Sequence, residues 1–98
     1  MTVLDPDAVD RALAGGLGWE RSGDELVKVR TGRDFADALG YVNAVGALAE
    51  AADHHPDVDI RWNTVTLRLS THSAGGITEK DLDLARRIDA LAQEAGGR

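Results

Sequence analysis

Pro56 divides the longest helical pattern of the chain from its clearest strand pattern. From Asp34 onward apolar residues recur at helical spacing, and they are Phe35, Leu39, Val42, Val45, Ala49 and Ala52. A proline holds the residue before it in extended geometry, so this helix is expected to end near Asp53 or His54. Beyond the proline, apolar and polar residues alternate as in a strand covered on one face. The apolar set is Val65, Leu67 and Leu69, and the hairpin that contains it should turn near Trp62-Asn63.

The N-terminal third predicts a short helix and a first hairpin. Asp5-Pro6 reads as an N-cap followed by a proline at the first helical position, and Gly15-Gly16 reads as the stop. Val27 and Val29 then alternate with charged neighbours, as in a hairpin covered on one face.

The C-terminal third predicts one more helix. Thr78 and Asp81 have the spacing of a capping box, with Ile77 and Leu82 placed as a hydrophobic staple. The buried stripe of this helix is expected to be Leu84, Ala85, Ile88, Leu91 and Ala92.

These patterns predict an α+β fold in the order α-β-β-α-β-β-α. A four-stranded antiparallel sheet with three helices packed on one face is the simplest way to bury the apolar stripes. The 98 residues give one small domain, residues 1–98, with one modest core.

Composition excludes several classes of function. The chain has no cysteine, so it can form neither a disulfide nor a cysteine-based metal or redox site. The formal net charge of -6 argues against direct binding of nucleic acid. No apolar run approaches the ~20 residues that cross a bilayer, and the N-terminus lacks a signal-peptide pattern. We therefore expect a cytoplasmic protein that has no membrane partner.

The three histidines are the candidate functional residues. His54 and His55 lie at the predicted helix end, and His54 follows Glu50 by four residues, which places a carboxylate within one helical turn of the imidazole. A histidine so placed is suited to general-acid work. His72 is expected at the end of a strand, on its polar face. Zinc is not expected, because the spacing of the histidines matches none of the usual zinc patterns.

Beyond these features, the spaced pattern resembles the pterin-4a-carbinolamine dehydratase family. The pattern consists of Glu50, His54-His55-Pro56, Trp62, His72 and Asp81, and the phrase WNTVTLRLSTHSAGGIT is similar to the second hairpin and following loop of that family. Two departures are visible. The segment VRTGRDF before the long helix has fewer aromatic residues than relatives often carry, and Val58 stands where some relatives have tryptophan.

The resemblance implies a hydro-lyase without a metal or other cofactor. Such an enzyme removes water from a 4a-hydroxytetrahydropterin, as in tetrahydrobiopterin recycling, and gives the quinonoid dihydropterin. His54 and His72 would transfer protons at the 4a-hydroxyl and at N5, in either assignment, while His55 would bind and orient the pterin. The resemblance also implies that Asp53, Ser70, Thr71 and Ser73 line the pocket.

Four further residues are expected to support the site or the fold around it. Asp81 reads as a helix cap whose contribution is stability, and Glu50 as a residue that orients His54 or as an ordinary exposed charge. Trp62 would be an aromatic wall of the pocket or part of the turn. Pro56 supports the site by ending the helix.

The family resemblance further implies dimers, sometimes paired into tetramers through helices. The exposed edge of a small sheet supports this, and the second hairpin is the expected contact because Val65 to Ser70 carries only one charge. The alternative function is that of a non-catalytic relative, which acts as a dimerisation or assembly cofactor for another protein.

Overall fold

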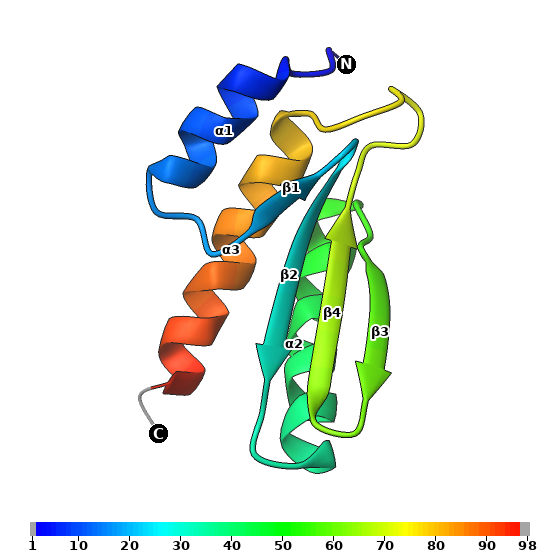
Figure 1. The fold of residues 1–98 in the computed structure, drawn as a ribbon. Coiled ribbons are helices and arrows are strands. Elements are labelled where there is room, and N and C mark those ends of the chain that lie inside the picture. The colour runs from blue at the N-terminus through cyan, green and yellow to red at the C-terminus, as the bar shows by residue number, and fades with distance from the viewer. Residues whose placement is uncertain (1, 97–98) are drawn as a thin grey trace.

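The computed structural model describes residues 2–96 of the backbone and residues 2–91 of the side chains. Three helices and four strands follow one another in the order α-β-β-α-β-β-α (Figure 1). They are α1 (Pro6–Ala14), β1 (Glu20–Ser22), β2 (Glu25–Thr31), α2 (Phe35–Ala52), β3 (Asp57–Arg61), β4 (Thr64–Leu69) and α3 (Glu79–Gly96). This order confirms the predicted α+β fold.

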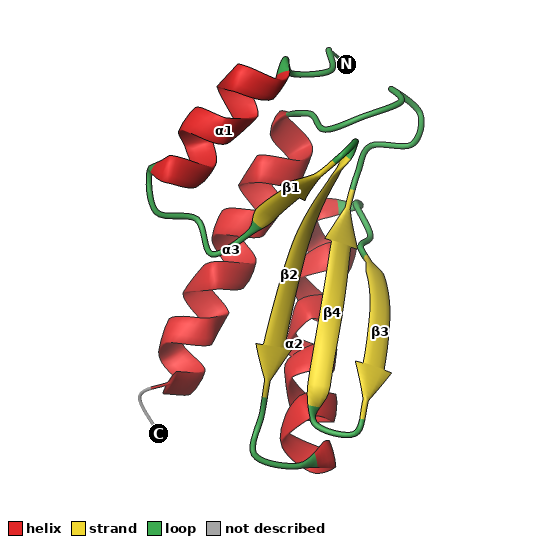
Figure 2. Ribbon diagram, viewed as in Figure 1, coloured by secondary structure: helices red, strands yellow, loops and turns green. Residues whose placement is uncertain are grey.

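The four strands form one antiparallel sheet in the spatial order β1-β2-β4-β3. The helices α2 and α3 lie behind the sheet and α1 packs beside α3, while the front face of the sheet carries no helix (Figure 2). The core lies between these layers and is formed mainly by β2, β4, α2 and α3. Its largest fully buried apolar side chains are Leu26, Leu67, Leu69, Leu84, Ile88, Val9, Val45 and Val65.

Local signals set the ends of the helices as the sequence predicts. The Asp5 carboxylate accepts the backbone N–H of Asp7 at 2.8 Å, and Pro6 stands in the first turn of α1. Asp34 caps α2 by accepting the N–H of Asp37 at 2.8 Å. At the other end of α2, Asp53 takes a left-handed conformation with φ 49°, which ends the helix three residues before Pro56.

The face of β2 that meets the helices differs from the prediction. Val27 and Val29 point to the open face of the sheet, and Val29 is 61% exposed. Leu26, Lys28 and Arg30 occupy the helix side instead, because they lie opposite the inward-facing residues of β4 in the register. The two cations are tolerated there because α2 and α3 supply partners. Lys28 Nζ donates to Asp89 at 2.8 Å, and Arg30 stacks on the Tyr41 ring at 4.4 Å.

The buried side of α2 agrees only in part with the predicted stripe, of which Val42 and Ala52 pack against the core. Ala38, Tyr41, Val45 and Ala49 are buried, whereas Phe35 and Leu39 are exposed. Asp37 and Glu50 are the only charges of this helix. An almost uniformly apolar helix does not define which side faces the core, and the pattern therefore selected a neighbouring stripe. In α3, the predicted Leu84, Ala85 and Ile88 are buried, and the side chain of Ala92 lies outside the described residues.

The strand that the sequence indicated for assembly, β4, is not an edge strand of the sheet. β4 lies between β2 and β3, so the edge strand of the second hairpin is β3. Val65 to Ser70 is therefore not an exposed edge, because both sides of β4 are paired. Contact through the second hairpin stays a prediction.

Tyr41 gives a test of the packing of α2 against the sheet. Burial raises the pKa of Tyr41 to about 12, and the nearby Arg30 guanidinium only partly opposes this shift. Since Tyr41 is the single tyrosine of the chain, phenolate absorbance near ~295 nm reports on it alone. We expect its midpoint to lie roughly two pH units higher in the folded protein than in denaturant, where tyrosine titrates near ~10.

The sign of this shift also predicts a loss of stability in alkali. The unfolded chain releases the phenol proton first, so the contribution of Tyr41 is complete below pH ~10 and declines as the pH rises toward ~12. Circular dichroism at each pH identifies the folded range. A midpoint near ~10 in protein that is still folded would contradict the buried position of Tyr41.

Candidate functional site

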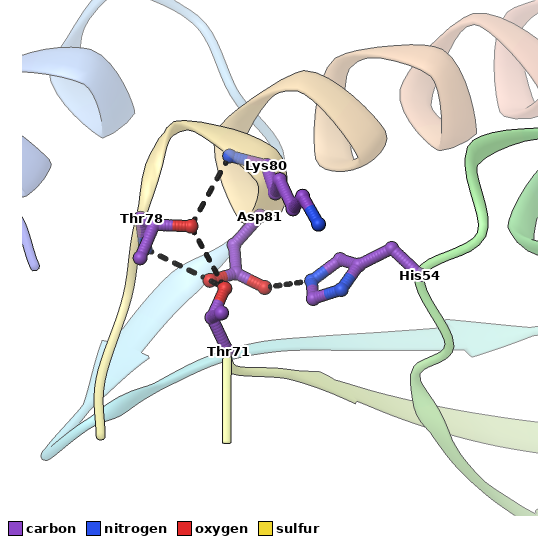
Figure 3. A network of polar contacts seen from close by, with 5 residues as sticks. All are labelled: His54, Thr71, Thr78, Lys80 and Asp81. Atoms are coloured by element: carbon purple, nitrogen blue, oxygen red, sulfur yellow. Dashed lines mark hydrogen bonds and ion pairs between the residues drawn. The ribbon is translucent and has the colours of Figure 1, made fainter. Parts of the chain in front are cut away.

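A buried carboxylate, Asp81, is the centre of a polar network at the C-terminal end of β4 (Figure 3). Asp81 lies in the first turn of α3 and is 0% exposed. Its Oδ2 accepts the Thr71 hydroxyl at 2.8 Å and the backbone N–H of Thr78 at 2.9 Å. The Thr71 and Thr78 hydroxyls are themselves 2.8 Å apart. These donors leave Oδ1 to face outward from the network.

His54 contacts this remaining carboxylate oxygen of Asp81. Its Nε2 lies 2.5 Å from Asp81 Oδ1, and the His54 side chain is only 11% exposed. An ionised carboxylate only accepts hydrogen bonds, so with Asp81 in that form Nε2 is the donor and Nδ1 is the nitrogen left for another group. A histidine whose ring is fixed by a buried acid is the arrangement that enzymes use for proton transfer.

Glu50 contacts His55 and not His54, which corrects the predicted pairing. The distance between His55 Nε2 and Glu50 Oε2 is 2.5 Å, and both side chains are exposed. The prediction assumed that the helix continues through residue 54. The left-handed turn at Asp53 instead breaks the helical spacing, and His54 then reaches toward α3.

His72 lies in the loop that follows β4, and not at the end of the strand. β4 ends at Leu69, and the turn is closed by a bridge between Thr71 and Gly76. His72 is exposed and follows Thr71 directly. The loop that carries His72 therefore starts beside Thr71, whose hydroxyl donates to the same carboxylate that contacts His54.

The other predicted pocket residues have different surroundings. Thr71 is buried and its hydroxyl donates to Asp81, so this hydroxyl supports the network from within. Asp53 and Ser73 are exposed, and Ser70 is half-buried. Pro56 lies between the histidine pair and the start of β3.

Trp62 lies at the opposite end of the sheet from His54. It occupies the turn between β3 and β4, with a left-handed φ of 53° and 67% of its surface exposed. The connection between α2 and β3, which carries His54, lies at the other end of the sheet from the β3–β4 turn (Figure 1). His54 there contacts Asp81. Within one chain, Trp62 is therefore a turn residue and not a wall of the histidine site.

The structure adds Thr78 to the site. The sequence identified Thr78 only as the start of a helix, and the capping box is confirmed because Asp81 accepts the Thr78 N–H. The same carboxylate also holds His54, so the cap is part of the histidine network. The signal in the sequence was the Thr78 to Asp81 spacing, which indicated the cap but not its second contact.

A second acid, Asp89, serves the fold at a distance from the histidines. Its carboxylate accepts the Gly18 N–H at 2.7 Å, the Trp19 indole N–H at 2.8 Å and Lys28 Nζ at 2.8 Å. An open hollow of about 490 Å³ beside it is lined by residues of α1, α3 and the segment after α1, and none of them is a histidine. Asp89 therefore joins α3 to the first hairpin.

The described residues contain no helix long and apolar enough to cross a membrane. Among the side chains of residues 2–91, no three histidine or acidic groups are clustered so that they could hold a metal ion. His54 and His55 instead contact two different carboxylates.

Sequence comparison relates the chain to proteins named for a single activity. A family model described as pterin 4 alpha carbinolamine dehydratase matches residues 2–91. A protein of Mycobacteroides abscessus is 53% identical over 89 residues, which cover 91% of this chain and 95% of the relative. One of Nocardia farcinica is 50% identical over 91 residues, covering 93% of this chain and 96% of the relative. Both carry the provisional name pterin-4-alpha-carbinolamine dehydratase.

Two solved structures are similar to this one. A crystal structure from Brucella melitensis, described as a transcriptional coactivator/pterin dehydratase, has a TM-score of 0.87 and 31% identity, and the match covers 93% of this chain and 99% of that chain. A pterin dehydratase-like protein described as a RuBisCO assembly factor in the alpha-carboxysome has a TM-score of 0.61 and 25% identity. That match covers 76% of this chain and 86% of the other. Proteins that share this fold are thus described as a dehydratase, a coactivator and an assembly factor.

Proposed function

This chain belongs to the pterin-4a-carbinolamine dehydratase family, and we propose that it is a hydro-lyase acting on 4a-hydroxytetrahydropterins. The reaction eliminates water from the carbinolamine and gives the quinonoid dihydropterin, as in tetrahydrobiopterin recycling. The observation that carries the proposal is His54, whose Nε2 lies 2.5 Å from the fully buried Asp81. This contact fixes the ring and leaves Nδ1 for the substrate.

Elimination requires two proton transfers. The 4a-hydroxyl must receive a proton as it leaves as water, and the ring nitrogen N5 must lose one. Nδ1 of His54 serves the first step when it is protonated and the second when it is not. His72, on the loop that begins beside the same carboxylate, takes the complementary step in our proposal.

His55 has the role of binding and orienting the pterin. Its contact with Glu50 holds the ring at the surface end of α2, next to the residue that performs the proton transfer. Asp53, Ser70 and Ser73 belong to the same end of the molecule and are proposed to contact the substrate, whereas Thr71 acts through Asp81.

The fold also supports a non-catalytic function as the second candidate. Two structural neighbours are described as a coactivator/dehydratase and as an assembly factor. A scaffold would not require a histidine fixed by a buried acid, and the presence of His54, His55 and His72 favours the enzyme. Self-association into dimers or tetramers is part of either proposal, and the exposed Phe35 and Leu39 on α2 support a contact between helices.

Turnover in the presence of a chelator tests the proposed function. Purified protein is expected to speed the dehydration of a synthetic 4a-hydroxytetrahydropterin without added metal, because imidazoles alone perform both proton transfers. The rate should persist in chelator. A strict metal requirement would contradict this mechanism, and a folded protein without any turnover would favour the scaffold.

A further inference from the structure

The residues before α1 run along the base of the loop that carries His72. We call residues 2–4 the N-terminal strap and residues 70–78, between β4 and α3, the histidine loop. Both lie at the same end of the molecule (Figure 1). The N–H of Leu4 donates to the carbonyl of Ile77 at 2.8 Å, and the Leu4 side chain packs against the core. The strap is therefore joined to the loop through its backbone.

Gly76 is the residue of the histidine loop that the strap covers. Gly76 is buried, and a Cβ at this position would lie 2.9 Å from Cγ1 and 3.5 Å from Cγ2 of Val3. Carbon atoms in ordinary contact lie roughly 3.5–4.0 Å apart. The isopropyl group of Val3 thus fills the space that a side chain at position 76 would need.

Space, and not backbone conformation, accounts for the glycine at position 76. Gly75 has a φ of 84°, which favours glycine, whereas Gly76 does not have a positive φ. Alanine at position 76 is therefore compatible with the backbone but not with the position of Val3. Val3 has few ways to avoid it, because its β-branched side chain is restricted at χ1 and its neighbour Leu4 is held by Ile77 and the core.

Gly76 is connected to both histidines to which we assign proton transfer. Its carbonyl accepts the N–H of Thr71 at 2.9 Å, which closes the turn, and His72 follows Thr71 directly. The Thr71 hydroxyl donates to Asp81 at 2.8 Å, and Asp81 contacts His54. A displacement of Gly76 would consequently move the residue that begins the turn and that also supports the carboxylate.

We propose that the N-terminal strap positions the histidine loop, and that Val3 is a positioning residue for the dehydration reaction. This inference rests on the proposed function, because it concerns the placement of His54 and His72. Val3 acts through Gly76, and its contact sets where the loop lies against the rest of the fold. A misplacement of about 1 Å at a reacting group can cost about 10²-fold in rate, so a contact of this kind has a measurable effect on turnover.

A double-variant cycle tests the contact. Gly76→Ala adds a methyl group where Val3 stands, and it should lower kcat about tenfold because the loop is displaced. Val3→Ala removes the methyl groups that cover Gly76, and it should lower kcat about threefold because the loop loses this support. In the variant with both changes the added methyl group enters the vacated space. Its kcat should therefore return to within about threefold of the wild type.

Gly46→Ala and Val29→Ala are the matched controls. Gly46 lies in α2, where nothing is within 4 Å of an added Cβ, and Val29 is a 61% exposed valine on the open face of the sheet. Both variants should keep the kcat of the wild type. If the two changes at Val3 and Gly76 act independently, the double variant loses the product of the two single losses, and this outcome would overturn the proposal. Should Gly76→Ala fail to fold, the double variant is expected to fold, and its failure would have the same meaning.

The ring signals of the histidines in nuclear magnetic resonance test the same contact without turnover. The chain has three histidines, so each signal is identified by its loss in a single alanine variant. Gly76→Ala should shift the signals of His54 and His72, and the double variant should return them toward the wild type. His55 contacts the exposed Glu50 and not the network, so its signal should stay in place. A strap that served stability alone would lower the denaturation midpoint and leave the ring signals and the kcat of the folded variants unchanged.

The two measurements separate failure of this inference from failure of the proposed function. An active wild type whose kcat and ring signals are insensitive to Gly76→Ala would show that the strap moves aside and would overturn the positioning role alone. An inactive wild type would overturn the proposed function. The ring signals would then decide on the strap, and unshifted signals of His54 and His72 in Gly76→Ala would overturn it as well.

Discussion

Replacement of His54 by alanine is expected to lower turnover by ~10² or more, the usual scale for a general acid or base. The ring is held by the buried Asp81 at 2.5 Å, so its loss removes the group to which we assign proton transfer, in an orientation that no neighbouring side chain reproduces. His72→Ala should have an effect of the same size, because the elimination needs both an acid and a base. Steady-state kinetics with the synthetic carbinolamine measures both variants.

His55→Ala is the matched control for these variants. His55 is adjacent in the chain but contacts the exposed Glu50, so its replacement should raise KM more than it lowers kcat. Circular dichroism establishes that each variant is folded. Full activity in both His54→Ala and His72→Ala would place the chemistry at another site.

Proline at position 67 is expected to prevent folding. Leu67 is fully buried in β4, between β2 and β3. Its N–H bonds to β2, and proline removes this bond at a cost of about 3 kcal/mol or more. Loss of the buried leucine side chain costs about 2–5 kcal/mol in addition. Together these losses are comparable with the total free energy of unfolding of a small domain, about 5–15 kcal/mol.

Val58→Pro, in the edge strand β3, is the matched control for proline in the interior strand β4. The N–H of Val58 points away from the sheet because Asp57, Asp59 and Arg61 make the bonds to β4. Proline is tolerated at such a position, so this variant should keep its fold. Circular dichroism compares the folding of the two variants. A folded Leu67→Pro variant would show that β4 does not lie in the interior of the sheet.

The order and the ends of the elements could be predicted because they depend on local signals. Asp5-Pro6, Asp34, Pro56 and Thr78 each act within a few residues of their position, through caps and restricted backbone angles. The inward face of β2 depends instead on distant residues. Lys28 is stable on the helix side because Asp89, 61 residues away, accepts a hydrogen bond from its ammonium group, and no local pattern contains that pairing.

The same distinction applies to the candidate site. The spacing of the histidines and of Asp81 identified the set, but the contacts within the set depend on a single backbone angle. The left-handed Asp53 turns His54 toward α3 and leaves His55 to Glu50. Helical spacing alone assigned Glu50 to His54, because it does not include that turn.

Asp81 has one contact that serves the fold and one that serves the candidate site. One oxygen of its carboxylate closes the first turn of α3 and the other orients His54. In a library of random substitutions, a selection for protease resistance and a selection for catalysis should therefore both reject changes at this position. Intolerance at Asp81 in a folding screen alone would say nothing about chemistry. At the exposed His72, by contrast, the two selections should differ. Substitutions there should be tolerated in the folding screen and rejected in the selection for catalysis.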